Sequence, residues 1–167
     1  MSADREESAW TSRDLLRHTV ATLAYRGGKA LRDVPEGFGA VRADPSARSA
    51  GEILAHVDDL MDWALSLARG RETWHNSVPA AFDADRARFF AALRALDDYL
   101  ASSAPLGTPA GKIFQGPIAD ALTRVGQIAL LRRLAGSPVR GEDYQRADIR
   151  IGRVEADQAP PRAEFGA

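Results

Sequence analysis

Three polar side chains lie at helical spacing within an otherwise apolar stretch, residues 116–136. Asp120, Arg124 and Gln127 are separated by four and then three positions, so in a helix they form one stripe of neighbouring side chains. The Asp120 carboxylate could ligate a divalent cation, or it could pair with Arg124. In a third interpretation, Arg124 holds Asp120 and an anionic ligand group. This stripe is therefore the first candidate for chemistry.

Histidine is the other residue type that could contribute to a metal site, because the chain has no cysteine. His56 lies at the edge of the apolar face of a predicted helix. There it could act as a ligand, or it could be a boundary residue that makes local hydrogen bonds with Glu52 or Asp59. His18 and His75 have no partner at ligand spacing. His56 is thus the histidine with a candidate role.

Other constellations for catalysis are missing from the sequence. There is no glycine-rich phosphate loop, no Gly-x-Ser-x-Gly elbow and no His-Glu-x-x-His motif. The adjacent pairs Asp58-Asp59 and Asp97-Asp98 point to different sides of a helix, so neither pair can converge on one substrate without other partners. The tryptophans could pack against the helices or line a pocket: Trp10, Trp63 and Trp74.

Composition indicates one globular domain, residues 1–167. Apolar residues make up 45% and charged residues 27%, the net charge is -1, and the pI is about 6.3. This balance does not favour a nucleic-acid partner. The sequence has no apolar signal-peptide core and no apolar run of membrane-spanning length, which predicts a cytoplasmic protein with no membrane partner.

Apolar residues at helical spacing predict an all-α fold, a four-helix bundle with long crossover loops. The first helix is expected over 11–33, with Thr11 or Ser12 as its cap and Gly27-Gly28 as a weak spot. The second is expected from Ser49, which forms a capping box with Glu52, to about residue 69.

The third and fourth helices are also bounded by signals in the sequence. Asp83 is expected to cap a helix that ends near residue 102. For the fourth helix, Gly116 is the expected N-cap, Pro117 the first helical residue and Gly136 the stop. Phe114 is expected to pack into the start of this helix as a hydrophobic staple.

The two ends of the chain lack a helical pattern. Residues 1–9 are expected to be flexible, and residues 137–167 are expected to form an extended tail that packs on the bundle. The tail could cover the cleft of its own subunit or reach a partner. Its apolar anchors are Tyr144, Ile149, Ile151, Val154 and Phe165.

Two segments carry a resemblance to a known family. SAGEILAHVDDL (49–60) and ADALTRVGQIALLRRLAG (119–136) resemble the DinB-like family, also called the damage-inducible or YfiT-like family. The resemblance covers essentially the whole chain. It implies a four-helix bundle, a homodimer and a divalent metal held by one histidine of the second helix and two histidines, four residues apart, on the fourth. Some members are hydrolases or thiol transferases, and many have no assigned activity.

The family's metal ligands correspond to His56, Asp120 and Arg124, and the third position departs from the pattern. An arginine has no lone pair to offer and stays protonated, so it cannot ligate a metal. The resemblance therefore implies a degenerate metal site with His56 and Asp120 as ligands and with Arg124 and Gln127 in the cleft. We expect no cofactor and a non-catalytic or ligand-binding bundle that takes a small molecule. The alternative is a hydrolase or thiol transferase that uses Zn, Ni or Mn.

Overall fold

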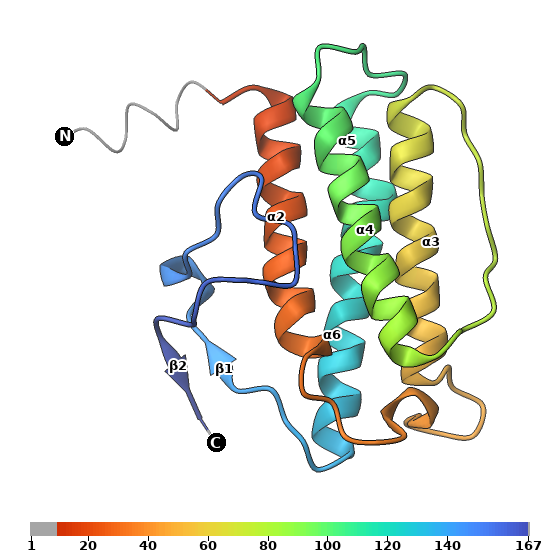
Figure 1. The fold of residues 1–167 in the computed structure, drawn as a ribbon, viewed down its shortest axis with the longest axis vertical. Helices are drawn as coiled ribbons and strands as arrows, with labels where there is room; N and C mark the ends of the chain where they lie inside the picture. Colours follow the sequence, from red (N-terminus) through yellow and green to blue (C-terminus); the bar gives the residue numbers. More distant parts are fainter. Residues whose placement is uncertain (1–9, 167) are drawn as a thin grey trace.

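The computed structural model describes residues 10–166 and shows a four-helix bundle (Figure 1). The predicted all-α class is confirmed. Residues 1–9, which were expected to be flexible, lie outside the described residues. No helix in the described part of the chain has both the length and the apolar character needed to cross a membrane. The bundle helices are α2 (Ser12–Leu31), α3 (Ala50–Ala68), α4 (Phe82–Ala101) and α6 (Ala119–Leu134).

Local capping chemistry fixes the starts of α2 and α3. Thr11 forms a capping box with Asp14, and Ser49 forms one with Glu52, so both predicted starts are confirmed. The predicted N-cap of α4 is wrong by two residues, because Ala81 is the N-cap and Asp83 lies inside the helix. A carboxylate still accepts a backbone hydrogen bond at this end of α4, because the N–H of Ala80 donates to Asp85 at 2.9 Å.

The connection between α3 and α4 runs back along the whole length of α3, so these two helices point in the same direction (Figure 1). A helix the length of α3 spans about 28 Å at 1.5 Å per residue. The connecting residues 69–81, about a dozen, can reach about 40 Å when extended. The connection is therefore long enough to return to the starting end of α3. It is a crossover loop, as the predicted architecture requires.

The fourth helix begins earlier than the sequence signals suggested. A short helix, α5 (Ala110–Ile113), leads through one π-helical turn, η2 (Phe114–Ile118), directly into α6. Gly116 is therefore not an N-cap, and Pro117 lies inside a continuous helix. The wider π turn accommodates the proline, which lacks an N–H, and burial of Ile113 favours the extension upstream. Phe114 is exposed rather than packed as a staple, whereas Gly136 ends the helix with φ +75° as expected.

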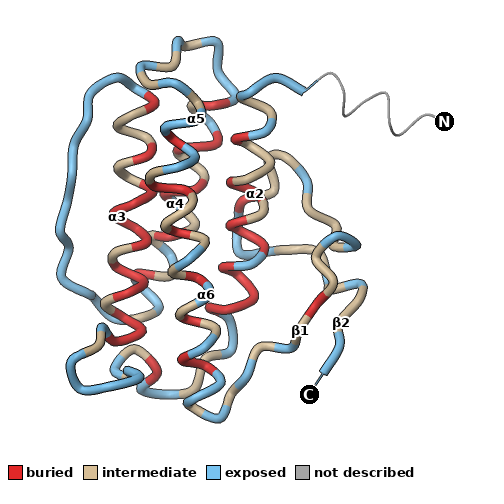
Figure 2. The backbone as a smooth tube through the Cα atoms, turned by 180° about the vertical axis from the view of Figure 1, so that it is seen from behind, coloured by how far each residue is buried: buried red, intermediate tan, exposed pale blue. Residues whose placement is uncertain are grey.

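The buried residues form one core between the four helices, as the red segments of the backbone in Figure 2 show. Gly27 on α2 faces the Phe89 ring of α4. A Cβ at this position would come within 2.6 Å of the Phe89 ring. Gly27 thus allows an aromatic ring of α4 to pack against the backbone of α2, and the weakness expected at Gly27-Gly28 stays a prediction.

The tail packs along the outer side of α2, away from the 69–81 connection (Figure 1). Val154 is completely buried and belongs to the core, whereas Phe165, another expected anchor, is exposed. The tail thus lies neither over the connection nor over the α3 face beneath it. Its short elements are β1 (Gly141–Glu142), the 3-10 turn η3 (Tyr144–Arg146) and β2 (Glu164–Phe165), and β1 and β2 pair in antiparallel orientation.

A buried ionic cluster joins the tail to α2. The Lys29 ammonium lies 2.8 Å from a carboxylate oxygen of Glu142 and 2.8 Å from one of Glu164. Tyr25 donates its hydroxyl hydrogen to the other oxygen of Glu142 at 2.7 Å. Burial and contact with Glu142 together raise the pKa of Tyr25, which keeps this hydroxyl protonated. The tail is therefore held by specific charge-assisted hydrogen bonds as well as by apolar burial.

Candidate functional site

The two residues that the sequence proposed as metal ligands lie next to each other. His56 is on α3 and Asp120 is in the first turn of α6, and the bundle packs these helices together. His56 Nε2 lies 3.4 Å from Asp120 Oδ2. The side chains are 16% and 36% exposed, respectively, so the pair sits at the edge of the bundle within reach of solvent.

Arg124 and Gln127 continue this pair along α6. Arg124 donates from Nε to Asp120 Oδ1 at 3.1 Å and from a terminal nitrogen to the Gln127 side-chain oxygen at 3.3 Å. The predicted helical stripe is thus a real row of contacts, and it meets His56 at one end. Both oxygens of Asp120 are engaged, one by the guanidinium and the other by the imidazole.

This donor set does not fit the metal centre that the family resemblance implies. Such a centre needs three protein ligands, typically 2.0–2.2 Å from a common point. His56 and Asp120 supply two, and the third position carries the cationic guanidinium of Arg124. Within residues 10–166, no three His, Asp or Glu side chains are grouped so that they could hold a metal ion. No step of chemistry is therefore assigned to a metal here.

The 69–81 connection supplies a second part of the site, of which the sequence indicated only Trp74 as a residue that could line a pocket. Asp59 on α3 accepts hydrogen bonds from the backbone N–H and the hydroxyl of Ser77, both at 2.7 Å. Closer to α3's C-terminus, the backbone N–H of Thr73 donates to the Ser66 hydroxyl at 3.0 Å. These bonds fix the connection against α3 and place Trp74, which lies between them, beside His56.

The carboxylates near His56 on its own helix have other roles. Glu52 belongs to the capping box of α3, and Asp59 binds Ser77 and Arg88, so neither forms the local hydrogen bond considered for His56. Although burial opposes it, hydrogen bonding from Ser77 and Arg88 holds the pKa of Asp59 below its usual value. Asp59 is therefore an anionic anchor for the connection.

Two tryptophans stand at right angles beside His56. The ring centroids of Trp63 and Trp74 are 5.8 Å apart with an interplanar angle of 87°, and His56 packs against Trp74 at 5.7 Å and 70°. We call the pair Trp63 and Trp74 the tryptophan corner. It opens onto a shallow hollow of about 350 Å³. The hollow is lined by His56, Leu60, Trp63, Glu72, Trp74 and Asp120.

The other histidines and the third tryptophan lie apart from this hollow. His75 is on the exposed connection and lines a different hollow with Asp62 and Arg71. Trp10 packs against His18 of α2, with ring centroids 5.0 Å apart. The two alternatives left open for tryptophan thus both occur, since Trp63 and Trp74 line a pocket and Trp10 packs.

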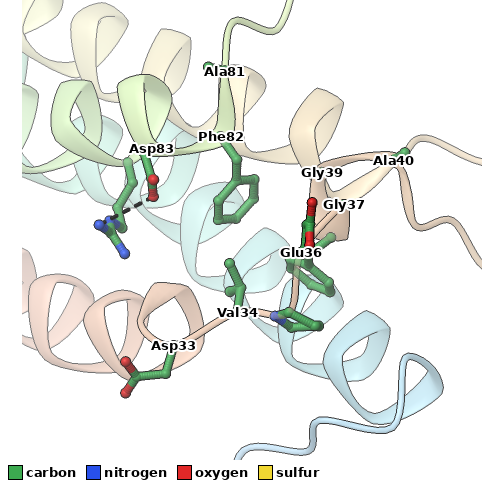
Figure 3. Close-up of a pocket in the computed structure, with 12 residues that line it drawn as sticks. Asp33, Val34, Glu36, Gly37, Gly39, Ala40, Ala81, Phe82 and Asp83 are labelled. Atoms are coloured by element: carbon green, nitrogen blue, oxygen red, sulfur yellow. Dashed lines mark ion pairs between the residues drawn. The ribbon is translucent and has the colours of Figure 1, made fainter.

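A larger hollow, of about 600 Å³, lies at the end of the bundle where α4 begins. Figure 3 shows the Phe82 ring and Val34 in it, with Asp83 paired to Arg86. That ion pair measures 3.2 Å, and the Phe82 ring packs on Phe38 with centroids 5.5 Å apart. None of the residues that the sequence predicted for the site lines this hollow.

Asp58, the neighbour of Asp59, is the most unusual ionisable group that the sequence left without a role. It is completely buried, and neither carboxyl oxygen has a hydrogen-bond partner among the described residues. Burial, together with the nearby carboxylates of Asp85, Asp62 and Asp59, raises the pKa of Asp58 to about 9 against the opposing effect of Arg88. Asp58 is consequently protonated and neutral at pH 7.

No family model matches the chain, and comparisons with curated proteins and with solved structures also found no match. The DinB-like resemblance therefore depends on the two sequence segments and on the residues described above.

Proposed function

We propose that this chain is a DinB-like bundle that binds a small molecule without catalysing a reaction, at a site where Arg124 takes the place of a metal ion. The observation that carries the proposal is the contact between Arg124 Nε and Asp120 Oδ1 at 3.1 Å. A fixed positive charge lies where the family pattern requires an electron-pair donor. Asp120 is thereby neutralised by the chain's own side chain.

The surroundings of His56 support binding as the role of this site. A hollow with aromatic walls and a few convergent polar groups is the usual form of a small-molecule site. Trp74 forms one wall although it is 47% exposed, and hydrogen bonds on either side of it fix the connection that carries it. The wall is therefore formed before any ligand arrives.

The family resemblance also supports a homodimer, and the sequence pattern supports the cytoplasm as its location. A second copy of the chain would need an apolar surface, and Leu15 on α2 and Phe114 on η2 are exposed beside each other at one hollow. Burying such side chains is the usual source of dimer stability. These two residues are the surface that we propose for the contact between subunits.

Metal uptake by wild type and by Arg124→His tests the proposed site. The protein is equilibrated with Zn, Ni or Mn, loosely held ions are removed, and the metal is measured by elemental analysis. Wild type should retain no stoichiometric metal, whereas R124H completes a His–Asp–His set and should retain about one ion per chain. Arg133→His is the matched control, because Arg133 is exposed on the same helix, and it should behave as wild type.

Two results would contradict the proposal. Stoichiometric metal in wild type that is lost on His56→Ala would mean that Arg124 does not replace the ion, and it would favour the hydrolase or thiol transferase. Failure of R124H to retain metal would show that His56, Asp120 and position 124 do not have the inherited geometry.

A further inference from the structure

We infer that the tryptophan corner binds a small organic cation, with a methylated ammonium group as the preferred chemistry. The inference rests on the proposed function, because it names the class of ligand for the same site. Three properties of the hollow carry it: the arrangement of its aromatic rings, the sign of its charges and its size.

The aromatic rings provide two walls at nearly a right angle. Trp63 and Trp74 meet at 87°, and the His56 ring packs against Trp74 at 70° and lines the same hollow. A cation near the corner can contact the electron-rich surfaces of more than one ring, and tryptophan is the aromatic residue that attracts cations most strongly. A methylated ammonium suits this geometry because its charge is spread over apolar methyl groups.

The uncompensated charge at the corner is negative, and it belongs to Glu72. Glu72 and Asp120 both line the hollow, and among the described residues its lining includes no lysine or arginine. Glu72 accepts a hydrogen bond from the neutral Trp63 indole N–H at 3.1 Å, so this contact leaves its negative charge uncompensated. Arg124 neutralises Asp120 from outside the lining. The sign of this charge favours a cation over the anionic ligand group considered from the sequence.

The corner is held in place by its supports. Gly116 in the π turn faces the outer edge of the Trp63 ring, and a Cβ there would come within 3.4 Å of that ring. Trp74 is fixed through the bonds that Thr73 and Ser77 make to α3. The hollow, about 350 Å³, is at the small end of the range of about 300–1,000 Å³ typical of ligand pockets. It suits a ligand with one ammonium head group.

Titration with choline, followed by NMR of the tryptophan indole N–H groups, tests the inference. The chain has three tryptophans, so its NMR spectrum contains three indole N–H signals, which are separate from those of the backbone amides. Millimolar choline should shift the signals of Trp63 and Trp74 and leave that of Trp10 unchanged. The matched ligand control is 3,3-dimethyl-1-butanol, which has the shape of choline but a carbon in place of the charged nitrogen. It should bind about two- to five-fold more weakly, as expected for a cation–π contact at a partly exposed site.

Variants of the chain separate the contributions of ring and charge. Trp74→Leu should abolish the choline-dependent shift of Trp63, and Glu72→Gln should weaken choline binding about five-fold while leaving the neutral alcohol unaffected. Trp10→Leu is the control and should bind choline as wild type does. Both Trp74 and Glu72 are exposed, so these variants should fold, and the remaining indole signals report directly on folding.

The inference is overturned if choline shifts none of the signals, if all three shift together, or if the neutral alcohol binds as tightly as choline. The last result would identify an apolar pocket without charge selectivity. None of these results bears on whether Arg124 replaces a metal, because the metal-uptake experiment uses different variants and a different measurement. Failure of the ligand assignment and failure of the proposed site are therefore distinguishable.

Discussion

Glu142 and Asp58 are both buried carboxyl groups, yet their surroundings are opposite. The side chain of Glu142 is 0% exposed, and Lys29 at 2.8 Å and Tyr25 at 2.7 Å bind its two oxygens. Asp58 is 0% exposed too, but neither of its oxygens has a hydrogen-bond partner among the described residues. Glu142 lies in the tail beside α2, whereas Asp58 lies on α3 within the helical bundle.

The difference shows that partners, rather than burial, decide what a buried carboxyl group does. Transfer from water penalises the charged form in both places. Lys29 compensates this penalty at Glu142, so the ion pair can hold the tail to α2. Arg88 is too weak an influence at Asp58, whose pKa is raised by burial and by neighbouring carboxylates to about 9. Glu142 therefore joins the tail to α2, whereas Asp58 stays protonated.

Removing the ammonium partner should have the largest effect, because it gives Glu142 the surroundings of Asp58. Lys29→Met keeps most of the apolar stem but leaves Glu142 buried beside Tyr25 alone. Breaking a buried pair in this way costs about 3–5 kcal/mol of unfolding free energy. Urea denaturation at pH 7 measures this loss.

Arg140→Met is the matched control for Lys29→Met. Arg140 approaches the same cluster through Glu164, at 3.7 Å, but its side chain is 60% exposed. An exposed pair of this kind contributes about 0–1 kcal/mol. If K29M were no less stable than R140M, the ionic cluster would not be what holds the tail.

Asp58→Asn should stabilise the protein at neutral pH, because the neutral amide takes up no proton on folding. The unfolded chain loses the Asp58 proton near the ordinary value of 3.8, whereas the folded chain keeps it up to a pKa of about 9. Between these values the unfolded state binds fewer protons, so wild-type stability falls by about 1.4 kcal/mol for each pH unit. D58N lacks this slope and should be about 4 kcal/mol more stable at pH 7.

Denaturation curves from pH 4 to pH 9 measure the effect of Asp58→Asn. Asp98→Asn removes an exposed carboxylate on α4 and should leave both stability and its pH dependence within about 0.5 kcal/mol of wild type. A D58N protein with the wild-type pH slope would show that Asp58 is ionised in the folded state, which would remove the contrast with Glu142.

The fold was predictable where a few neighbouring residues decide the structure. Ser49 and Glu52 satisfy each other's backbone N–H groups, so their spacing alone located the start of α3. The predicted start of the fourth helix was wrong. Pro117 is a strong local signal for a helix start, but the helix extends upstream of it, where Ile113 is buried. The parallel course of α3 and α4 also depends on the path of the 69–81 connection, which sequence spacing does not specify.

The candidate site was also predictable only in part, namely where helical spacing or the family motif grouped its residues. Helical spacing grouped Asp120, Arg124 and Gln127, and the family motif added His56, which lies 3.4 Å from Asp120. Glu72 and the orientation of Trp74 could not be predicted, since the position of the connection depends on bonds between residues 18 apart. Asp58 and Asp59 are identical in type and adjacent in sequence. Only the packing of α4 and the connection against α3 makes one an unpartnered acid and the other an anchor.

Asp59 is the intermediate case between Glu142 and Asp58, and Ser77→Ala should make it more like Asp58 by removing one of its hydrogen-bond partners. The substitution removes the hydroxyl bond of 2.7 Å but keeps the backbone N–H and Arg88 as partners. Because two partners remain, the unfolding free energy should fall by only about 1 kcal/mol. Amide hydrogen exchange should rise in residues 70–81 while staying unchanged in α2.

Ser103→Ala is the control for Ser77→Ala, because Ser103 is an exposed serine in the link after α4. Choline should bind S77A more weakly than S103A, since Trp74 lies three residues from the lost bond and a looser connection holds the tryptophan corner less firmly. If S77A kept wild-type exchange in 70–81, the backbone N–H and Arg88 alone would suffice to anchor the connection. Asp59 would then belong with Glu142, as a buried carboxylate whose remaining partners fully compensate its charge.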